Sequence, residues 1–133
     1  MKRVMVAGTF DIFHLGHEYF LKEARKFGDE LIVVIARDEN VLRIKGKQTK
    51  NNEDKRLNKV LESKIADKVV LGNKGNIFNI IEEIEPEVIC LGYDQPIDEN
   101  KLKREIENRN LIIQIVRLPA FKPEIYKSSL MKE

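Results

Sequence analysis

The chain has 133 residues, 42% of them hydrophobic and 35% charged, which is enough for one domain with one hydrophobic core. Its 24 basic and 22 acidic residues nearly balance, which argues against a nucleic-acid-binding protein. No apolar run approaches the roughly 20 residues that span a bilayer, and no signal peptide is recognisable. Cys90 is the only cysteine, so no intrachain disulfide can form. We therefore expect a cytoplasmic protein without a membrane partner.

Strand-like and helix-like segments alternate along the chain, as successive βαβ units require. Apolar runs that indicate strands lie at residues 4–7, 31–36, 68–71, 88–91 and 111–116. Helical patterns lie at residues 18–27, 52–65, 77–84 and 98–108, and residues 43–51 are interpreted as a basic, mobile loop. The alternation predicts a single α/β domain over residues 1–133, built as a Rossmann-like, doubly wound parallel sheet of about five strands.

A glycine- and histidine-bearing segment follows the first predicted strand. It contains Gly8-Thr9-Phe10-Asp11 and then His14-Leu15-Gly16-His17, which include the only two histidines of the chain. A turn between a strand and a helix binds phosphate readily, because backbone N–H groups and the positive end of the helix dipole converge there. Gly16 leaves room for phosphates against the backbone. The alternative is that the two histidines only cap a helix or face solvent.

Together the two segments resemble the GTFD and HxGH motifs of the cytidylyltransferase-like nucleotidyltransferases, and the resemblance extends over residues 4–129. It implies nucleotidyl transfer, which depends on alignment of the phosphates and on cations around them. His14 and His17 would donate hydrogen bonds to the phosphate oxygens, and Mg²⁺ would bridge phosphates without a protein cage. The resemblance also implies that substrate lies against Gly8, Thr9, Phe10, Asp11 and Gly16. The partner of Asp11 could be a metal ion, the ribose or only backbone, and all three stay open.

Two cationic segments resemble phosphate- or nucleotide-binding parts of the family. Lys45 is our first choice for the family's loop lysine and Lys47 the second, although charge alone would indicate a solvated loop. Arg56 is similar to the family's helix arginine near the nucleotide. The alternative for Arg56 is a surface pair with Glu53, worth ~0.3–0.5 kcal/mol.

Two further segments complete the predicted site. Gly92 and Asp94 follow the fourth predicted strand, in a loop that faces the nucleotide in the family and is otherwise a simple turn. Tyr126, Ser128 and Ser129 lie where related enzymes carry a motif of the form RTxGISTT. This chain departs from that motif, with Lys122 in place of its arginine.

Two branches of the family differ in their substrates. Glycerol-3-phosphate cytidylyltransferases join CTP to glycerol phosphate, and archaeal FAD synthases join ATP to FMN. Residues 36–41, 84–89 and 91–95 resemble the archaeal FAD synthases, although the C-terminal segment lacks the cysteines that those enzymes can carry. We therefore expect ATP and FMN as substrates. The alternatives are the cytidylyl branch and a nucleotide- or flavin-binding protein without catalysis, and family analogy also predicts a homodimer.

Overall fold

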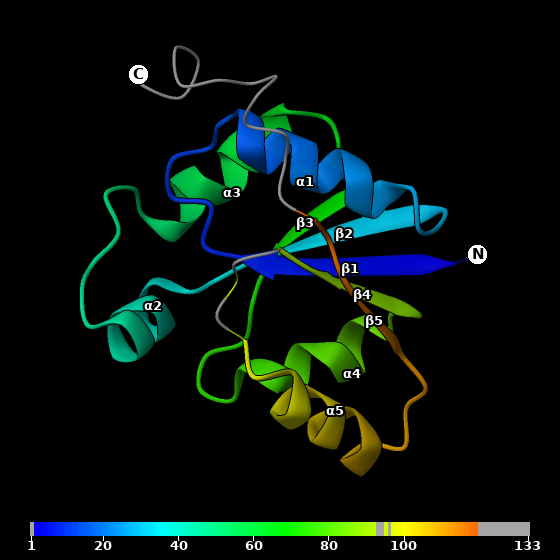
Figure 1. The fold of residues 1–133 in the computed structure, drawn as a ribbon. Helices are drawn as coiled ribbons and strands as arrows, with labels where there is room; N and C mark the ends of the chain where they lie inside the picture. Colours follow the sequence, from blue (N-terminus) through cyan, green and yellow to red (C-terminus); the bar gives the residue numbers. More distant parts are fainter. Residues whose placement is uncertain (1, 93–94, 96, 120–133) are drawn as a thin grey trace.

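A parallel sheet with strand order β3-β2-β1-β4-β5 forms the centre of a computed structural model that describes residues 2–92, 95 and 97–119 (Figure 1). The strands are β1 (Arg3–Gly8), β2 (Glu30–Ile35), β3 (Lys68–Leu71), β4 (Val88–Leu91) and β5 (Gln114–Arg117). All four strand pairs are parallel, and the chain winds outward from β1 in both directions. The predicted doubly wound α/β fold is therefore confirmed.

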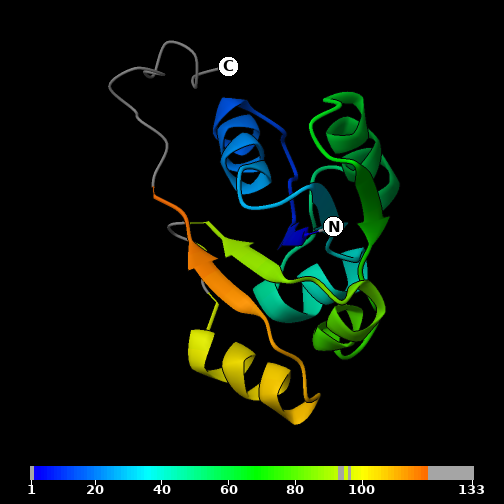
Figure 2. The same ribbon diagram turned by 90° about the vertical axis from the view of Figure 1, so that its right-hand side faces the viewer.

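Helices cover both faces of the sheet (Figures 1 and 2). On one face lie α1 (Leu15–Arg25) and α3 (Glu53–Glu62), and on the other lie the 3₁₀ helix η1 (Ile77–Asn79), α4 (Ile80–Ile84) and α5 (Glu99–Asn108). Because its two faces are both covered, β2 is buried from Leu31 through Ile35, as its continuous apolar run indicates.

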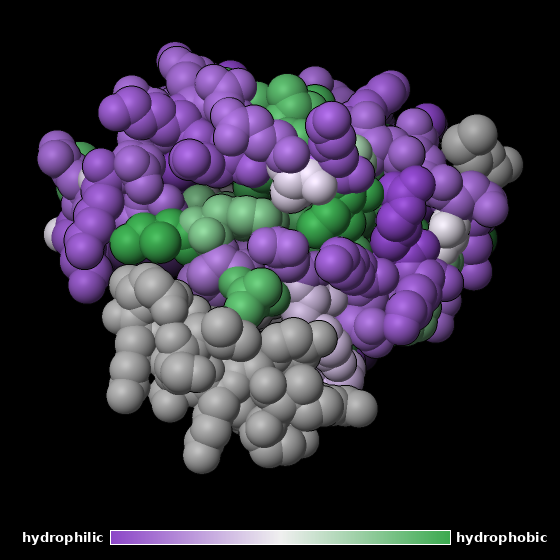
Figure 3. All heavy atoms as spheres, turned by 90° about the horizontal axis from the view of Figure 1, so that it is seen from above, coloured by the Kyte–Doolittle hydropathy of each residue, from purple (hydrophilic) through white to green (hydrophobic). Residues whose placement is uncertain are grey.

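Alternate strand residues divide the interior into two hydrophobic cores. Val4 and Val6 of β1 belong to the core beneath α1 and α3, whereas Met5 belongs to the core beneath α4 and α5. The first core extends to the surface through partly buried side chains, among them Phe20, Leu57 and Ile65. Figure 3 views the molecule from above and shows a mostly hydrophilic face with a hydrophobic strip crossing it.

N-cap residues that the sequence indicates fix the starts of two helices. Asn52 and Asp98 accept hydrogen bonds from the backbone N–H groups of Lys55 and Lys101, which fixes the starts of α3 and α5. The predicted first helix, residues 18–27, is displaced, because His14 caps it and α1 begins at Leu15. The predicted helix at residues 77–84 is divided between η1 and α4.

The prediction of a mobile loop at residues 43–51 is wrong in its first part, because α2 (Asp38–Lys45) occupies it. This short helix buries only Asn40 and Val41, so its apolar periodicity is weak. Asn40 is satisfied there, since its amide donates to the Asn73 carbonyl at 2.6 Å. Acidic residues in its first turn and basic residues in its last turn complement the helix dipole. Gly46, with φ of 76°, ends the helix.

The fifth strand begins later than the apolar run at residues 111–116 predicts. Asn110, in the left-handed region with φ of 56°, ends the turn after α5. The Leu111 N–H then bonds back to the Ile106 carbonyl, and pairing with β4 starts only at Gln114. Cys90 of β4 is buried as predicted, and burial raises the pKa of its thiol to about 11.

Stability measurements test the placement of this core. Leu31→Ala removes a fully buried side chain from β2, so we expect the free energy of unfolding to fall by about 2–5 kcal/mol. Ile112→Ala is the matched control, because Ile112 is 97% exposed, and its effect should stay within about 0.5 kcal/mol. Urea unfolding followed by circular dichroism measures both. Equal losses for the two variants would contradict the assigned burial.

Candidate active site

His14 and His17 lie together at the start of α1, beyond the carboxyl end of β1. The Gly16 N–H donates to His14 Nδ1 at 3.0 Å, and the His14 N–H donates to His17 Nδ1 at 3.3 Å, forming a reciprocal cap. Their rings stack with centroids 4.0 Å apart. Because each Nδ1 accepts a hydrogen bond, each neutral ring carries its proton on Nε2. The two histidines therefore cap the helix, as the alternative interpretation expects, and they also lie side by side at its start.

The side chain of Phe10, which the sequence analysis placed against substrate, is buried. It is only 5% exposed and packs in the core beneath α1. Its ring lies edge-on to the His17 ring, with centroids 5.1 Å apart. The side chain therefore supports the histidine from within the fold, and Gly8, beside it at the end of β1, is partly exposed.

Asp11 holds the segment that precedes α3. Its two carboxylate oxygens accept hydrogen bonds from the backbone N–H groups of Lys50 and Asn51, both at 2.9 Å. The Asn51 amide donates to the Asp11 carbonyl at 2.7 Å. Of the three partners left open by the sequence, the structure pairs Asp11 with backbone. Burial would raise the pKa of the Asp11 carboxyl, but these amides and the Arg56 charge outweigh it and lower that pKa.

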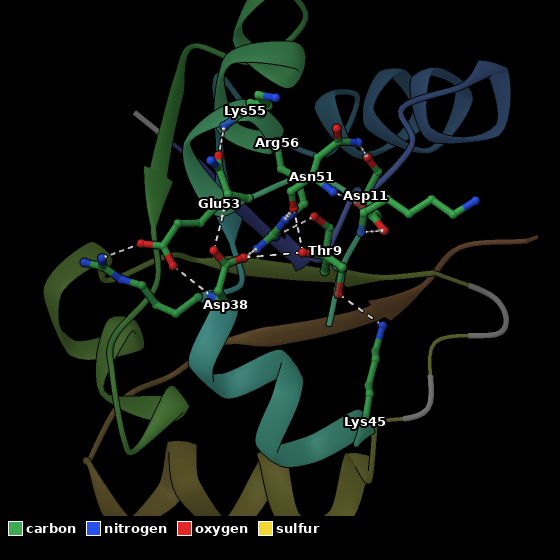
Figure 4. Close-up of polar contacts among 12 residues, drawn as sticks. Thr9, Asp11, Asp38, Lys45, Asn51, Glu53, Lys55 and Arg56 are labelled. Carbon is green, nitrogen blue, oxygen red and sulfur yellow. Dashed lines mark hydrogen bonds and ion pairs between the residues drawn. The ribbon is translucent and has the colours of Figure 1, made fainter. Parts of the chain in front are cut away.

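Arg56 is fully buried at the centre of the same network, shown in Figure 4. Its guanidinium donates to the carbonyls of Asn51 and Thr9 at 3.1 and 2.9 Å, and to the Asp38 carboxylate at 2.6 Å. The alternative of a surface pair with Glu53 is wrong, because Glu53 pairs with Arg37 at 3.0 Å. Arg56, predicted to lie near the nucleotide, is thus enclosed in the fold and holds these three segments together.

Asp38 belongs to this network although the sequence analysis assigned it no role. It accepts from the Glu53 N–H at 3.1 Å as well as from Arg56, so it joins the starts of α2 and α3. Burial would raise the pKa of the Asp38 carboxyl, but the hydrogen bonds from Arg56 and Glu53 lower it overall. The sequence signal that could have indicated Asp38 is an acidic residue in the first turn of a helix. It was missed because α2 itself was not predicted.

Lys45 lies in the last turn of α2, and its side chain extends to the turn between β1 and α1, residues 9–14, which we call the motif turn (Figure 4). Its ammonium donates to the Thr9 hydroxyl at 3.1 Å, so the structure brings Lys45 and Thr9 together, as the predicted site requires. Lys47 follows Gly46 and is exposed. The described geometry thus places one of the two candidate lysines at the carboxyl end of β1.

The loop after β4 is held by two side chains that the sequence analysis did not select. Gln95 accepts from the Gly92 N–H at 3.1 Å and donates to the Ala7 carbonyl at 3.0 Å, bridging the ends of β4 and β1. Arg117 donates to the Gly92 carbonyl at 2.6 Å. The remaining predicted residues lie outside the described part of the chain, namely Asp94, Lys122, Tyr126, Ser128 and Ser129.

The described residues contain no group of three or more His, Cys, Asp or Glu side chains that could hold a metal ion. Among the same residues, no helix is long and apolar enough to cross a membrane. The polar groups that the described residues bring to the carboxyl end of β1 include two imidazoles, an ammonium and a hydroxyl. Such groups can bind and stabilise the negative charge of phosphates.

A family model described as cytidylyltransferase-like matches residues 5–133, so the chain belongs to this family of nucleotidyltransferases. Its curated relatives include archaeal proteins named FAD synthase. The protein of Thermoplasma volcanium is 41% identical over 133 residues, covering all of this chain and 93% of the relative. That of Archaeoglobus profundus is 47% identical, covering 97% of this chain and 82% of the relative. The sequence analysis favoured the branch to which these relatives belong.

Solved structures agree with the fold. A Thermoplasma volcanium protein, named there as a lipopolysaccharide core biosynthesis protein, has a TM-score of 0.86 and 43% identity, covering 92% of this chain and 99% of that one. A pantoate-beta-alanine ligase from Francisella tularensis has a TM-score of 0.61 at 16% identity, covering 91% of this chain and 60% of that one. The second likeness shows the fold alone.

The carboxylates of Asp11 and Asp38 predict that the stability of the fold depends on pH. A carboxyl whose pKa is lower in the folded state contributes stability that is full above its ordinary pKa of about 4 and is lost as pH falls through the folded value. We therefore expect Asp11→Asn to be less stable than the wild type at pH 7 and the difference to shrink below about pH 4. Urea unfolding at several pH values measures it.

The exposed Glu62→Gln on α3 is the control, and it should stay within about 0.5 kcal/mol of the wild type at every pH. A difference between Asp11→Asn and the wild type that is independent of pH would contradict the assigned role of the carboxylate.

Proposed function

We propose that this protein is an FMN adenylyltransferase, an FAD synthase that transfers AMP from ATP to FMN. The observation that carries the proposal is the agreement of curated relatives, 41–49% identical over most of the chain, that are named FAD synthase. The assembled site supports it, because His14, His17 and Lys45 all lie at the carboxyl end of β1. Ligands of doubly wound sheets bind at this edge, near the point where the strand order reverses.

In the proposed reaction, a phosphate oxygen of FMN attacks the α-phosphorus of ATP. The bond between the α-phosphorus and the bridging oxygen breaks, so pyrophosphate leaves and FAD forms. Negative charge increases on the phosphate oxygens in the transition state. Donors that are already aimed at those oxygens lower the barrier without reorganising.

The two imidazoles and the lysine supply those donors. Nδ1 of each ring is used inside the cap, so Nε2 is the atom that presents an N–H to phosphate. The Lys45 ammonium is held by the neutral Thr9 hydroxyl, and a phosphate oxygen would be a stronger acceptor because it is charged. None of these groups forms a covalent bond to the substrate.

Mg²⁺ enters as part of the nucleotide. Magnesium commonly binds to substrate phosphates with few protein ligands. The Asp11 carboxylate is occupied by backbone amides, and the Asp38 carboxylate by Arg56 and Glu53. These contacts support the proposal that the ion arrives bound to ATP and is not held by a set of protein carboxylates.

A pyrophosphate-release assay with Mg²⁺, pairing ATP or CTP with FMN or glycerol-3-phosphate, tests the activity. We expect release only with ATP and FMN, accompanied by FAD detected chromatographically. Release only with CTP and glycerol-3-phosphate would replace the proposal by the cytidylyl branch. Binding of ATP or FMN by calorimetry without any release would favour a binding protein that does not catalyse.

His17→Ala tests the assignment of the site. We expect FAD formation to fall by at least about 100-fold, because the variant loses a preorganised donor to the transferring phosphate. Lys22→Ala is the control, since Lys22 is an exposed residue of α1 that faces solvent beyond the cap, and it should retain the wild-type rate. Near-normal turnover by His17→Ala would overturn the proposed role of the histidine.

We also propose that the enzyme acts in the cytoplasm, where ATP and FMN are available, and that it forms a homodimer. The family resemblance supports the dimer. Light scattering on the purified protein measures the mass, with a dimer giving twice the 15.5 kDa of one chain.

A further inference from the structure

The His17 imidazole is surrounded by other rings. The His14 ring stacks on it with centroids 4.0 Å apart, and the Phe13 ring lies nearly parallel to it at 5.6 Å, with an interplanar angle of 16°. The Phe10 ring meets it edge-on at 5.1 Å and 66°. Offset-stacked and edge-to-face pairs at these separations are the favoured arrangements of aromatic rings.

Phe10 adopts an unusual backbone conformation to place its ring there. Its φ is 51°, in the left-handed region that side chains with a Cβ rarely occupy, and a bulky residue there is a conformational outlier. Such strain persists only where the surrounding structure enforces it, and it concentrates at functional sites. The side chain is only 5% exposed, so the strained backbone turns a large ring into the core directly beneath His17.

Gly8 makes room for this ring. A Cβ built on Gly8 would lie 2.8 Å from the Phe10 ring, closer than real Cβ atoms approach other atoms. The φ of Gly8 is not in the left-handed region, so space for Phe10 explains the glycine better than backbone conformation does. The inward position of the Phe10 ring therefore requires a glycine at position 8.

The cap contributes a hydrogen bond to the His17 ring. The His14 N–H donates to His17 Nδ1 at 3.3 Å. A donor must be held close to its productive geometry, and a 1 Å displacement can cost about 100-fold in rate. Ring contacts on three sides restrict the imidazole in addition to its hydrogen bonding.

We infer that Phe10 and Phe13 are positioning residues for His17: they hold its imidazole so that Nε2 is aimed at the phosphate, while neither ring contacts the reacting atoms. The inference rests on the proposed function, because His17 must act on phosphate for its orientation to affect turnover. It gives the two phenylalanines of the segment 8–17 a role that is distinct from nucleotide binding.

Steady-state kinetics of Phe10→Leu and Phe13→Leu measure the effect on turnover. Each variant keeps an apolar side chain but loses the aromatic plane, so we expect kcat for FAD formation to fall about 10- to 100-fold, with KM for ATP and FMN within about twofold of the wild type. Phe13→Tyr keeps the ring at a partly exposed position and should restore most of kcat.

Phe27→Leu is the matched control. Phe27 packs against the same hydrophobic core but follows the far end of α1, away from His17. The same substitution there should lower stability without lowering kcat. A loss of kcat in Phe27→Leu as large as that in Phe10→Leu would show a general effect of core damage and would overturn the inference.

Imidazole NMR signals give a readout that does not need substrate. The untagged chain has only two histidines, so its spectrum contains two sets of ring signals, and His17→Ala assigns them. We expect the His17 signals to move toward those of a free imidazole in Phe10→Leu and Phe13→Leu, because ring-current contributions and fixed orientation are lost. They should not move in Phe27→Leu.

The outcomes separate the inference from the proposed function. Unchanged kcat in a folded Phe10→Leu, or a loss of kcat with unmoved His17 signals, would overturn the inference while the wild type still made FAD. If Phe10→Leu does not fold, Phe13→Leu decides the question at its more exposed position. Absence of FAD formation by the wild type would overturn the proposed function, and the NMR result would then show only whether the rings fix the imidazole.

Discussion

The buried guanidinium of Arg56 is the interaction on which the candidate site depends. An isolated charge would be very costly to bury, so its burial requires partners for its N–H groups. Those partners are the Thr9 carbonyl after β1, the Asn51 carbonyl before α3 and the Asp38 carboxylate at the start of α2. Because one rigid planar group bonds to all three segments, it fixes the motif turn, α2 and α3 relative to one another.

The residues of the segment 8–17 differ in the direction their side chains take. Phe10 turns inward beneath His17, and Asp11 turns toward the backbone of residues 50 and 51. The His14 ring and the Lys45 ammonium are exposed, and His17 beside them is partly exposed. Two side chains of the segment 8–17 thus hold neighbouring parts of the fold, which is how precise sites are usually supported.

The sequence predicted the sheet well because apolar runs of parallel strands are strong signals, and residues 68–71 and 88–91 match β3 and β4 in both boundaries. It predicted a phosphate-binding role for Lys45, but only through resemblance to a family, and the contact of Lys45 with Thr9 is a finding of the structure. It missed α2, whose stability comes from polar contacts such as that of Asn40 with Asn73, and these have no periodicity. It also missed Gln95 and Arg117, because their partners are backbone groups brought close only by the fold.

The short helix α2 explains how a lysine of a charged segment becomes part of a site. On a flexible loop, Lys45 would lose much conformational entropy when it bound phosphate, whereas a lysine already held in place loses less. Helix α2 is fixed at its start by Asp38 and along its length by Asn40, so the backbone of Lys45 is ordered in advance. Its ammonium bonds to the neutral Thr9 hydroxyl, which is a weaker acceptor than an anionic oxygen. The lysine is therefore ordered beside the motif turn by a contact that a phosphate oxygen can replace.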